Sequence, residues 1–193
     1  MILRSVGWAL TGFGAAHVLE SAWHRFTAHG KRPDPTRTGH LEHHRTAAEP
    51  VDVWGEIKEN AWRVGKTLAL TNLVLAPFIG LTRSLPLTFG LTAGFVSVSY
   101  YHARMHRRAP RGRYEEWMWR FHWHHHATNV RVNFGLTNPL LDFALGTAVV
   151  PDEVELPPNY APAWLRELGG SYAGIRIRPE RARTATETAA ASS

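Results

Sequence analysis

Histidines are the residues of this chain whose type and spacing best suit chemistry. The 193 residues include 12 His and no Cys. Without Cys the chain cannot form a disulfide, an iron–sulfur cluster, a thiolate zinc site or a cysteine nucleophile. Imidazole nitrogen is a good ligand for Fe, Zn, Cu and Ni and a poor one for Mg or Ca. The composition therefore points to a metal site built from histidine.

The histidines fall into short motifs with helical spacing. Because residues three or four apart share a helix face, HLEHH at 40–44 and HWHHH at 122–126 each direct several imidazoles toward one point. HARMH at 102–106 forms a pair in the same way. The two histidines of HRFTAH, at 24 and 29, are five apart, which is roughly 140° around an ideal helix. One of them must therefore lie at a helix end or a bend.

Ten of these histidines are too many ligands for one ion but suit two, so we predict a di-metal site. Structural zinc is usually four-coordinate and usually includes Cys. A large all-His set instead indicates a redox site with positions open for a small molecule. A lone His on a helix is usually an ordinary core or surface residue, and this reading holds for His124, which is rotated from its neighbours' face. The predicted ligands are His24, His29, His40, His43, His44, His102, His106, His122, His125 and His126.

No other catalytic motif competes with the histidines. The sequence contains no GxSxG, P-loop, GxGxxG or HExxH pattern. The residue order in HLEHH does not place Glu42 as the base of a metalloprotease.

An apolar stretch separates the two halves of the histidine set. Residues 67–101 carry a single charge, Arg83, and a helix needs roughly 20 apolar residues to cross a bilayer. We predict a transmembrane hairpin with helices at about 67–82 and 85–103, in which Ser84 caps the second helix and Pro86 lies in its first turn. The alternative is a buried helical hairpin of a soluble protein.

Small residues follow one face of the second arm of this hairpin, which allows close backbone approach to another helix. They are Gly90, Ala93, Gly94 and Ser97.

Two further helices are expected before the hairpin. Residues 5–23 form a third apolar segment, in which His17, Glu20 and His24 share one face and so point inward toward partners. A signal peptide is the alternative for this segment, but it lacks a convincing cleavage site. Residues 51–66 have helical apolar spacing and basic neighbours, which indicate an interfacial helix or a soluble amphipathic one.

The net charge of +6 is carried mainly by Arg, and the positions of the basic residues indicate which kind of partner the chain binds. Lys and Arg are dense at 25–66 and 104–131, whereas Arg83 alone lies in the hairpin. The positive-inside rule then places both His-rich blocks in the cytoplasm, at the surface of what we expect to be a bacterial plasma membrane. A lipid bilayer is therefore the expected partner, and nucleic acid is not.

These patterns predict an all-α fold. It is an integral membrane helical bundle with a transmembrane hairpin and a cytosolic His-rich helical cap that holds the di-metal site. Residues 1–150 form this domain, and 151–193 form a tail that is first Pro-rich and then Arg/Ala-rich. The tail has one short helical candidate at 162–168 and is expected to be disordered from Ile175.

The order HxxxxH, HxxHH, hairpin, HxxxH, HxxHH resembles that of the fatty acid hydroxylase/sterol desaturase superfamily of membrane di-iron enzymes. ESAWHRFTAH at 20–29 looks like the family's Glu-x-x-x-His-Arg-Phe opening. NFGLTNPLLDFALGT at 133–147 is similar to its ending of Phe-Gly, Trp-Asp and Phe-Gly-Thr, with Leu141 in place of the Trp and Leu145 in place of the Phe. The agreeing positions are Phe134, Gly135, Asp142, Gly146 and Thr147. The resemblance covers residues 17–147.

The resemblance implies that the ten histidines bind two Fe ions, which Zn can replace on purification, and that O2 is a co-substrate. It implies that Glu20, one helical turn before His24, accepts the second N–H of a ligand ring. Asp142 has a similar role or packs the end of the fold, and His17 supports the ligands from outside their motifs.

The implied activity is O2-dependent hydroxylation of a C–H bond of a membrane lipid, fatty acyl or related. An external ferredoxin- or cytochrome-type donor with its reductase would supply the electrons. Motif spacing is closest to the fatty acid 2-hydroxylase branch, while HRFTAHG at 24–30 is shared with carotenoid ring hydroxylases. Carotenoid hydroxylation and lipid desaturation therefore remain alternatives within the superfamily. A non-catalytic di-zinc membrane protein is the alternative from another class.

Overall fold

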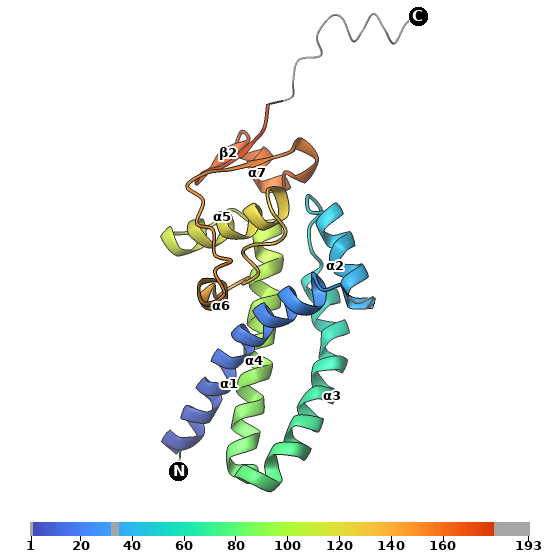
Figure 1. The fold of residues 1–193 in the computed structure, drawn as a ribbon, viewed down its shortest axis with the longest axis vertical. Coiled ribbons are helices and arrows are strands. Elements are labelled where there is room, and N and C mark those ends of the chain that lie inside the picture. Colours follow the sequence, from blue (N-terminus) through green and yellow to red (C-terminus); the bar gives the residue numbers. More distant parts are fainter. Residues whose placement is uncertain (1, 32–34, 180–193) are drawn as a thin grey trace, which may run out of the picture.

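The computed structural model describes residues 2–31 and 35–179. Three long helices form its elongated part: α1 (Ile2–Trp23), α3 (Val53–Ile79) and α4 (Leu81–Arg107). α3 and α4 make a hairpin, and α1 lies along α4, as Figure 1 shows. The N-terminus lies at the same end of this part as the turn between α3 and α4, and the remaining elements gather at the other end.

Glycines bring α1 and α4 into close contact. A Cβ at Gly90 would collide with the backbone of Ala9, and a Cβ at Gly12 would collide with the backbone of Leu87. The small-residue face predicted on the second arm of the hairpin is therefore the face that packs against α1.

The hairpin differs from its prediction in where it turns. The chain reverses at Gly80, whose φ of +79° is in the region that favours glycine, rather than at 82–86. Ser84 is consequently not a cap but a buried residue inside α4, and Pro86 lies in the second turn of that helix. The segments predicted separately at 51–66 and 67–82 are one continuous helix, α3, which ends at Ile79.

Asp52 begins α3 by accepting a hydrogen bond from the Trp54 backbone N–H at 3.1 Å.

Within the described ranges, no helix combines the length and the apolar character required to cross a membrane. The predicted transmembrane crossing is therefore not confirmed.

A π-helix and a short α-helix follow α1. The π-helix η1 (His24–Ala28) continues α1 directly, and α2 (Pro35–Arg45) lies beside it. α5 (Arg113–Ala127) crosses the end of the hairpin, and the five-residue α6 (Leu140–Ala144) packs beside α1 (Figure 1).

The C-terminal segment forms a small sheet, so the fold is mostly helical, as predicted, but not all-α. β1 (Val154–Leu156) pairs in parallel with β3 (Ile175–Ile177), which pairs antiparallel with β2 (Ser171–Tyr172). The 3-10 helix η2 (Pro158–Tyr160) and α7 (Ala163–Glu167) connect β1 to β2. α7 matches the helix predicted at 162–168.

This sheet covers α5 and completes the hydrophobic core. Leu156, Leu165 and Ile175 are fully buried with the aromatic side chains of α5. Ile175 is therefore ordered in a strand, contrary to the expected disorder from that residue onward. Residues 180–193, the rest of the predicted disordered end, lie outside the described residues.

Candidate metal centre

All ten predicted histidine ligands lie at the junction of η1, α2, α4 and α5. Nine of them form two groups, and within each group one ring nitrogen of every histidine lies within 4.8 Å of those of the others. The first group is His24, His29, His40, His44 and His125. The second is His43, His102, His106 and His126. The tenth, His122, joins the second group through His106, with 2.9 Å between their Nε2 atoms.

The π-helix brings His24 and His29, which are five residues apart in the sequence, close to one face. The His29 N–H donates to the His24 carbonyl at 3.0 Å, which is the i→i+5 bond of a π-turn. Residues five apart then lie near one face, and the ring centroids of the two histidines are 5.0 Å apart. The bend that the sequence required is therefore present and is a π-helix.

The contacts of His40 fit a metal site better than a hydrogen-bond network. Its Nε2 lies 2.9 Å from the Nε2 of His24, 2.9 Å from that of His29 and 3.0 Å from that of His44. A neutral imidazole carries only one N–H, so these three contacts cannot all be hydrogen bonds. Two nitrogens about 2.1 Å from one ion are about 3.0 Å apart at a right angle and about 3.4 Å apart at a tetrahedral angle. The donor set therefore fits an ion of high coordination number.

The second group has the same character. The Nε2 atoms of His43 and His102 are 3.0 Å apart. Both ring nitrogens of buried His126 have no hydrogen-bond partner among the described residues. Buried polar groups usually have a partner, and a metal ion would supply one here. The rings of His126 and His44 stack with centroids 4.1 Å apart, so the two groups adjoin.

Backbone carbonyls set the orientation of three rings. The Nδ1–H groups of His24, His106 and His125 donate to the carbonyls of Phe134, Ala47 and Val132, at 2.5, 2.9 and 2.7 Å. This arrangement assigns the proton to Nδ1. The lone pair of Nε2 is then directed into the groups, as a metal ligand requires.

Burial keeps the rings uncharged at neutral pH. It lowers the pKa of His29 to about 4, with the charge of Arg37 as a smaller cause. It also lowers the pKa of His43 to about 3, with a further contribution from His106. Only neutral imidazole binds a metal, so the rings are in the correct protonation state for binding.

An ion pair fixes α5 relative to α4, which carry five of the ten histidines. The Arg104 guanidinium donates to both carboxylate oxygens of Glu115, with one distance of 2.8 Å. Both side chains are largely buried, and Arg104 also lies over the Trp119 ring at 5.8 Å. This bidentate pair locks the corner that brings the two His motifs together.

The acidic residues lie behind the rings and organise the segment after α5. Asp142 accepts hydrogen bonds from the N–H groups of Phe134 and Gly135, at 3.0 and 2.8 Å. Glu20 is buried, accepts from the Leu136 N–H at 3.4 Å, and lies 3.7 Å from the Nδ1 of His24. The Nδ1–H of His24 donates to the Phe134 carbonyl. Asp142 and Glu20 therefore hold the segment that supplies this carbonyl.

Two histidines lie outside both groups. His124 is half-buried on α5, as its rotation from its neighbours predicted. His17 contacts Thr137 through Nδ1 and Ser97 through Nε2. It therefore connects α1, α4 and the segment before α6 rather than supporting a ring of the metal centre.

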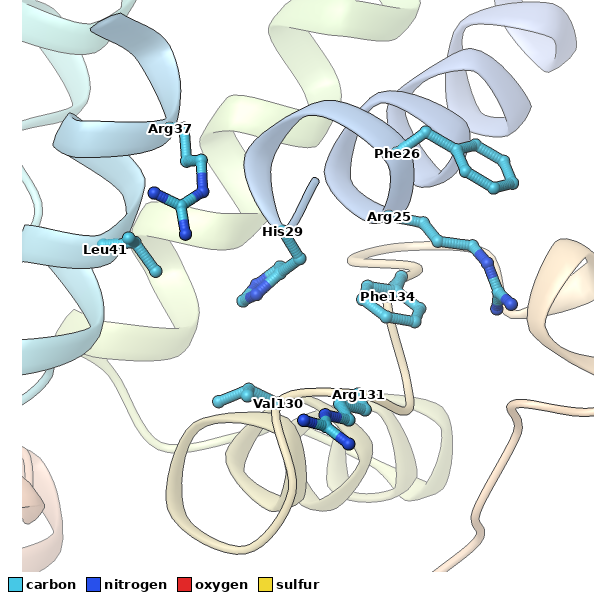
Figure 2. Close-up of a pocket in the computed structure, with 8 residues that line it drawn as sticks. All are labelled: Arg25, Phe26, His29, Arg37, Leu41, Val130, Arg131 and Phe134. Carbon is cyan, nitrogen blue, oxygen red and sulfur yellow. The ribbon is translucent and has the colours of Figure 1, made fainter. Parts of the chain in front are cut away.

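A cavity of ≈ 430 Å³ opens beside the first group (Figure 2). His29 forms one wall. Three basic side chains, Arg25, Arg37 and Arg131, and four apolar ones, Phe26, Leu41, Val130 and Phe134, complete it. The cavity therefore borders the metal centre at His29.

The family model described as fatty acid hydroxylase matches residues 9–147. The chain belongs to the fatty acid hydroxylase family. The matched segment includes all ten histidines and ends at Thr147, as the motif resemblance predicted. Membership of this family supports an oxidoreductase of hydroxylase type.

A solved structure of full-length Scs7p, in which only the hydroxylase domain is visible, has a similar fold. The TM-score is 0.56 at 19% sequence identity. The match covers 78% of the present chain and 58% of that chain. No curated protein sequence matches significantly.

The sequence did not reveal the residues of the histidine centre that act through their backbone. Ala47 and Val132 contribute only carbonyl oxygens, so their side chains give no signal. Asn133 was also missed: its φ of +59° and its side-chain bonds to the backbone of Phe121 and Val149 fix the segment after α5. Asn is among the few residues that adopt such a conformation readily, and this could have marked the position.

Proposed function

We propose that this protein is an O2-dependent di-iron hydroxylase that acts on a C–H bond of a fatty acyl or related membrane lipid. The observation that carries the proposal is the convergence of two largely buried histidine groups, in which neighbouring Nε2 atoms are 2.9 to 3.0 Å apart. Two adjoining all-nitrogen sites with more than four donors suit a pair of redox ions better than structural zinc. Family membership supports the reaction class.

Iron bound at these groups would supply the redox chemistry with which one O2 oxygen enters a C–H bond and the other leaves as water, at a cost of two electrons and two protons. An external ferredoxin- or cytochrome-type donor is proposed as the electron source. The chain's own part is to hold the ligands. The carbonyls of Phe134, Ala47 and Val132 orient three rings, and buried Trp119 and Trp123 exclude water behind them.

The outer face of the hairpin supports a lipid environment. Soluble proteins rarely expose large contiguous apolar patches. α3 and α4 expose large apolar side chains on both sides of the turn that joins them. They are Leu70, Leu73, Val74, Phe78, Leu81, Leu85 and Phe89. We propose that this face lies in a bilayer, with the histidine centre on the cytoplasmic side.

Lipid analysis of cells that express the protein tests the proposal. Expression should produce a hydroxylated acyl lipid that control cells lack, and a His125→Ala variant should not. Elemental analysis of the protein after mild-detergent purification should find iron. A new carotenoid or an unsaturated lipid would assign one of the other activities instead. Two tightly bound zinc ions with no new lipid or pigment would show a non-catalytic protein.

The same lipid analysis tests the finer proposal that the enzyme belongs to the 2-hydroxylase branch. This requires the hydroxyl at C2 of the acyl chain. A hydroxyl elsewhere would retain the hydroxylase and reject the branch.

A further inference from the structure

The cavity beside His29 has a charge that the metal centre does not explain. Three of its eight lining side chains are arginines, and none is acidic. Among the described residues, no ion pair joins Arg25, Arg37 or Arg131 to a carboxylate. A cationic wall beside ions that are themselves positive is unfavourable unless an anion binds there.

The three arginines are not equivalent. Arg25 donates to Thr147 Oγ1 at 2.7 Å and lies over the ring of Phe134 at 5.3 Å, so it is part of the wall. Arg37 donates through Nε to the Gly30 carbonyl at 2.8 Å, and no carboxylate of the described residues pairs with its guanidinium. Arg131 is exposed. Figure 2 shows Arg37 and Arg131 on opposite sides of the cavity, with His29 between them.

Apolar side chains beside the arginines make the cavity complementary to a lipid, which has a charged head group and an apolar chain. Leu41 and Val130 lie next to the two arginines, and Phe26 is 64% exposed at the margin of the cavity. A volume of ≈ 430 Å³ is in the lower part of the usual range for ligand pockets, about 300–1,000 Å³. The cavity therefore suits a head group and the first carbons of one chain, and the rest of the chain would extend past Phe26.

We propose that this cavity is an anion-recognition site in which Arg37 and Arg131 bind the charged head group, a carboxylate or a phosphate, of a single-chain acyl lipid. Guanidinium groups bind both anions through paired N–H donors. The proposal rests on the proposed function because it names the class of substrate that reaches the centre. It excludes a neutral hydrocarbon, such as a carotene, from this cavity.

Displacement of a fluorescent fatty acid tests the proposal without turnover. The metal-loaded protein in neutral detergent is titrated with cis-parinaric acid, which is then displaced by palmitate, hexadecyl phosphate or methyl palmitate. Palmitate or hexadecyl phosphate should bind at least about tenfold more tightly than the uncharged ester. The tighter of the two identifies the head group as carboxylate or phosphate.

Variants connect the binding to the two arginines. Arg131→Gln and Arg37→Gln should each weaken the anionic ligand by about tenfold and leave methyl palmitate unchanged. Arg131→Lys should lose less, because it keeps the charge without the paired donors. Arg113→Gln, at an exposed arginine at the start of α5, is the matched control and should bind like the wild type. Metal content measured in every variant shows that the centre is intact.

Equal binding of acid and ester, no displacement at all, or unchanged affinity in both glutamine variants would overturn the proposal. If both glutamine variants keep their affinity for the anionic ligand but lose electron transfer from a donor protein, the arginines would instead belong to a docking site for that donor. Absence of a hydroxylated product would reject the proposed function and leave this binding result standing, so the two failures are distinguishable.

Discussion

Each oriented imidazole in the centre makes two kinds of contact. Its Nε2 meets other rings, and its Nδ1 meets a backbone carbonyl. His125 shows both, because Nε2 lies 3.0 Å from that of His29 and Nδ1 donates to Val132 at 2.7 Å. The spacing of the motif predicts the first contact. The second comes from a carbonyl, which every residue type carries, so the sequence could not predict it.

Replacing His125 should remove a ligand from the first group. We expect His125→Ala to lower the metal bound per chain by about half and to abolish product. The matched control is His124→Ala, since His124 is the adjacent residue and lies outside both groups. Elemental analysis per chain measures the difference. Full metal content in His125→Ala would show that this ring is not a ligand.

The partly buried rings of His29 and His43 also predict how the metal-free protein responds to acid. Their pKa values in the folded chain, about 4 for His29 and about 3 for His43, are below the value of 6.5 expected after unfolding. Between these values the unfolded chain binds more protons. The free energy of unfolding therefore falls as the pH falls from 6.5 toward 4.

Thermal unfolding of the metal-free protein measures this effect. The Tm should be nearly constant above pH 7 and should decrease progressively below pH 6.5. A His43→Leu variant removes one of the titrating rings and should show a shallower decrease. A Tm that stays level or rises between pH 6.5 and pH 5 would contradict the burial of these rings as neutral groups.

At the scale of elements, the sequence predicted the helices better than their ends. The apolar run at 67–101 correctly indicated a hairpin, because an apolar segment of this length has room for two helices. The turn was misplaced because Ser84 and Pro86 resemble a helix start, whereas the positive φ of Gly80 decides the reversal. Strands β1 and β3 are three residues each, too short for a clear alternation, and their parallel pairing joins distant segments.

The α1–α4 contact is the element-scale feature that a mutation tests most directly. Gly90→Ala places a Cβ against the Ala9 carbonyl and forces the two helices apart, so we expect a loss of about 1–3 kcal/mol in the free energy of unfolding. Gly14→Ala is the control in α1, because a Cβ there meets nothing within 4 Å. It should be neutral or stabilise the helix by about 0.5–1 kcal/mol. Denaturant unfolding in detergent compares the two, and equal effects would refute a tight contact at Gly90.

At the scale of the whole molecule, the C-terminal sheet and the metal centre share one core. Trp164 in α7 donates through its indole N–H to the Met105 carbonyl at 3.1 Å, next to His106. Leu156 and Ile175 pack in the same cluster as Trp119 and Phe121 of α5. The family match ends at Thr147, so this covering segment lies outside the matched region and still supports the helix that carries three of the ligands.

Truncation tests whether the metal centre depends on this covering segment. A chain that ends at Val150 loses the sheet and α7, so the aromatic face of α5 becomes exposed and the free energy of unfolding falls. We expect this variant to unfold at a lower temperature and to bind less metal, because α5 positions His122, His125 and His126. A chain that ends at Pro179 keeps every described contact and should match the full-length protein in both measurements. Unchanged metal content in the Val150 variant would show that the first 150 residues form the centre without this support.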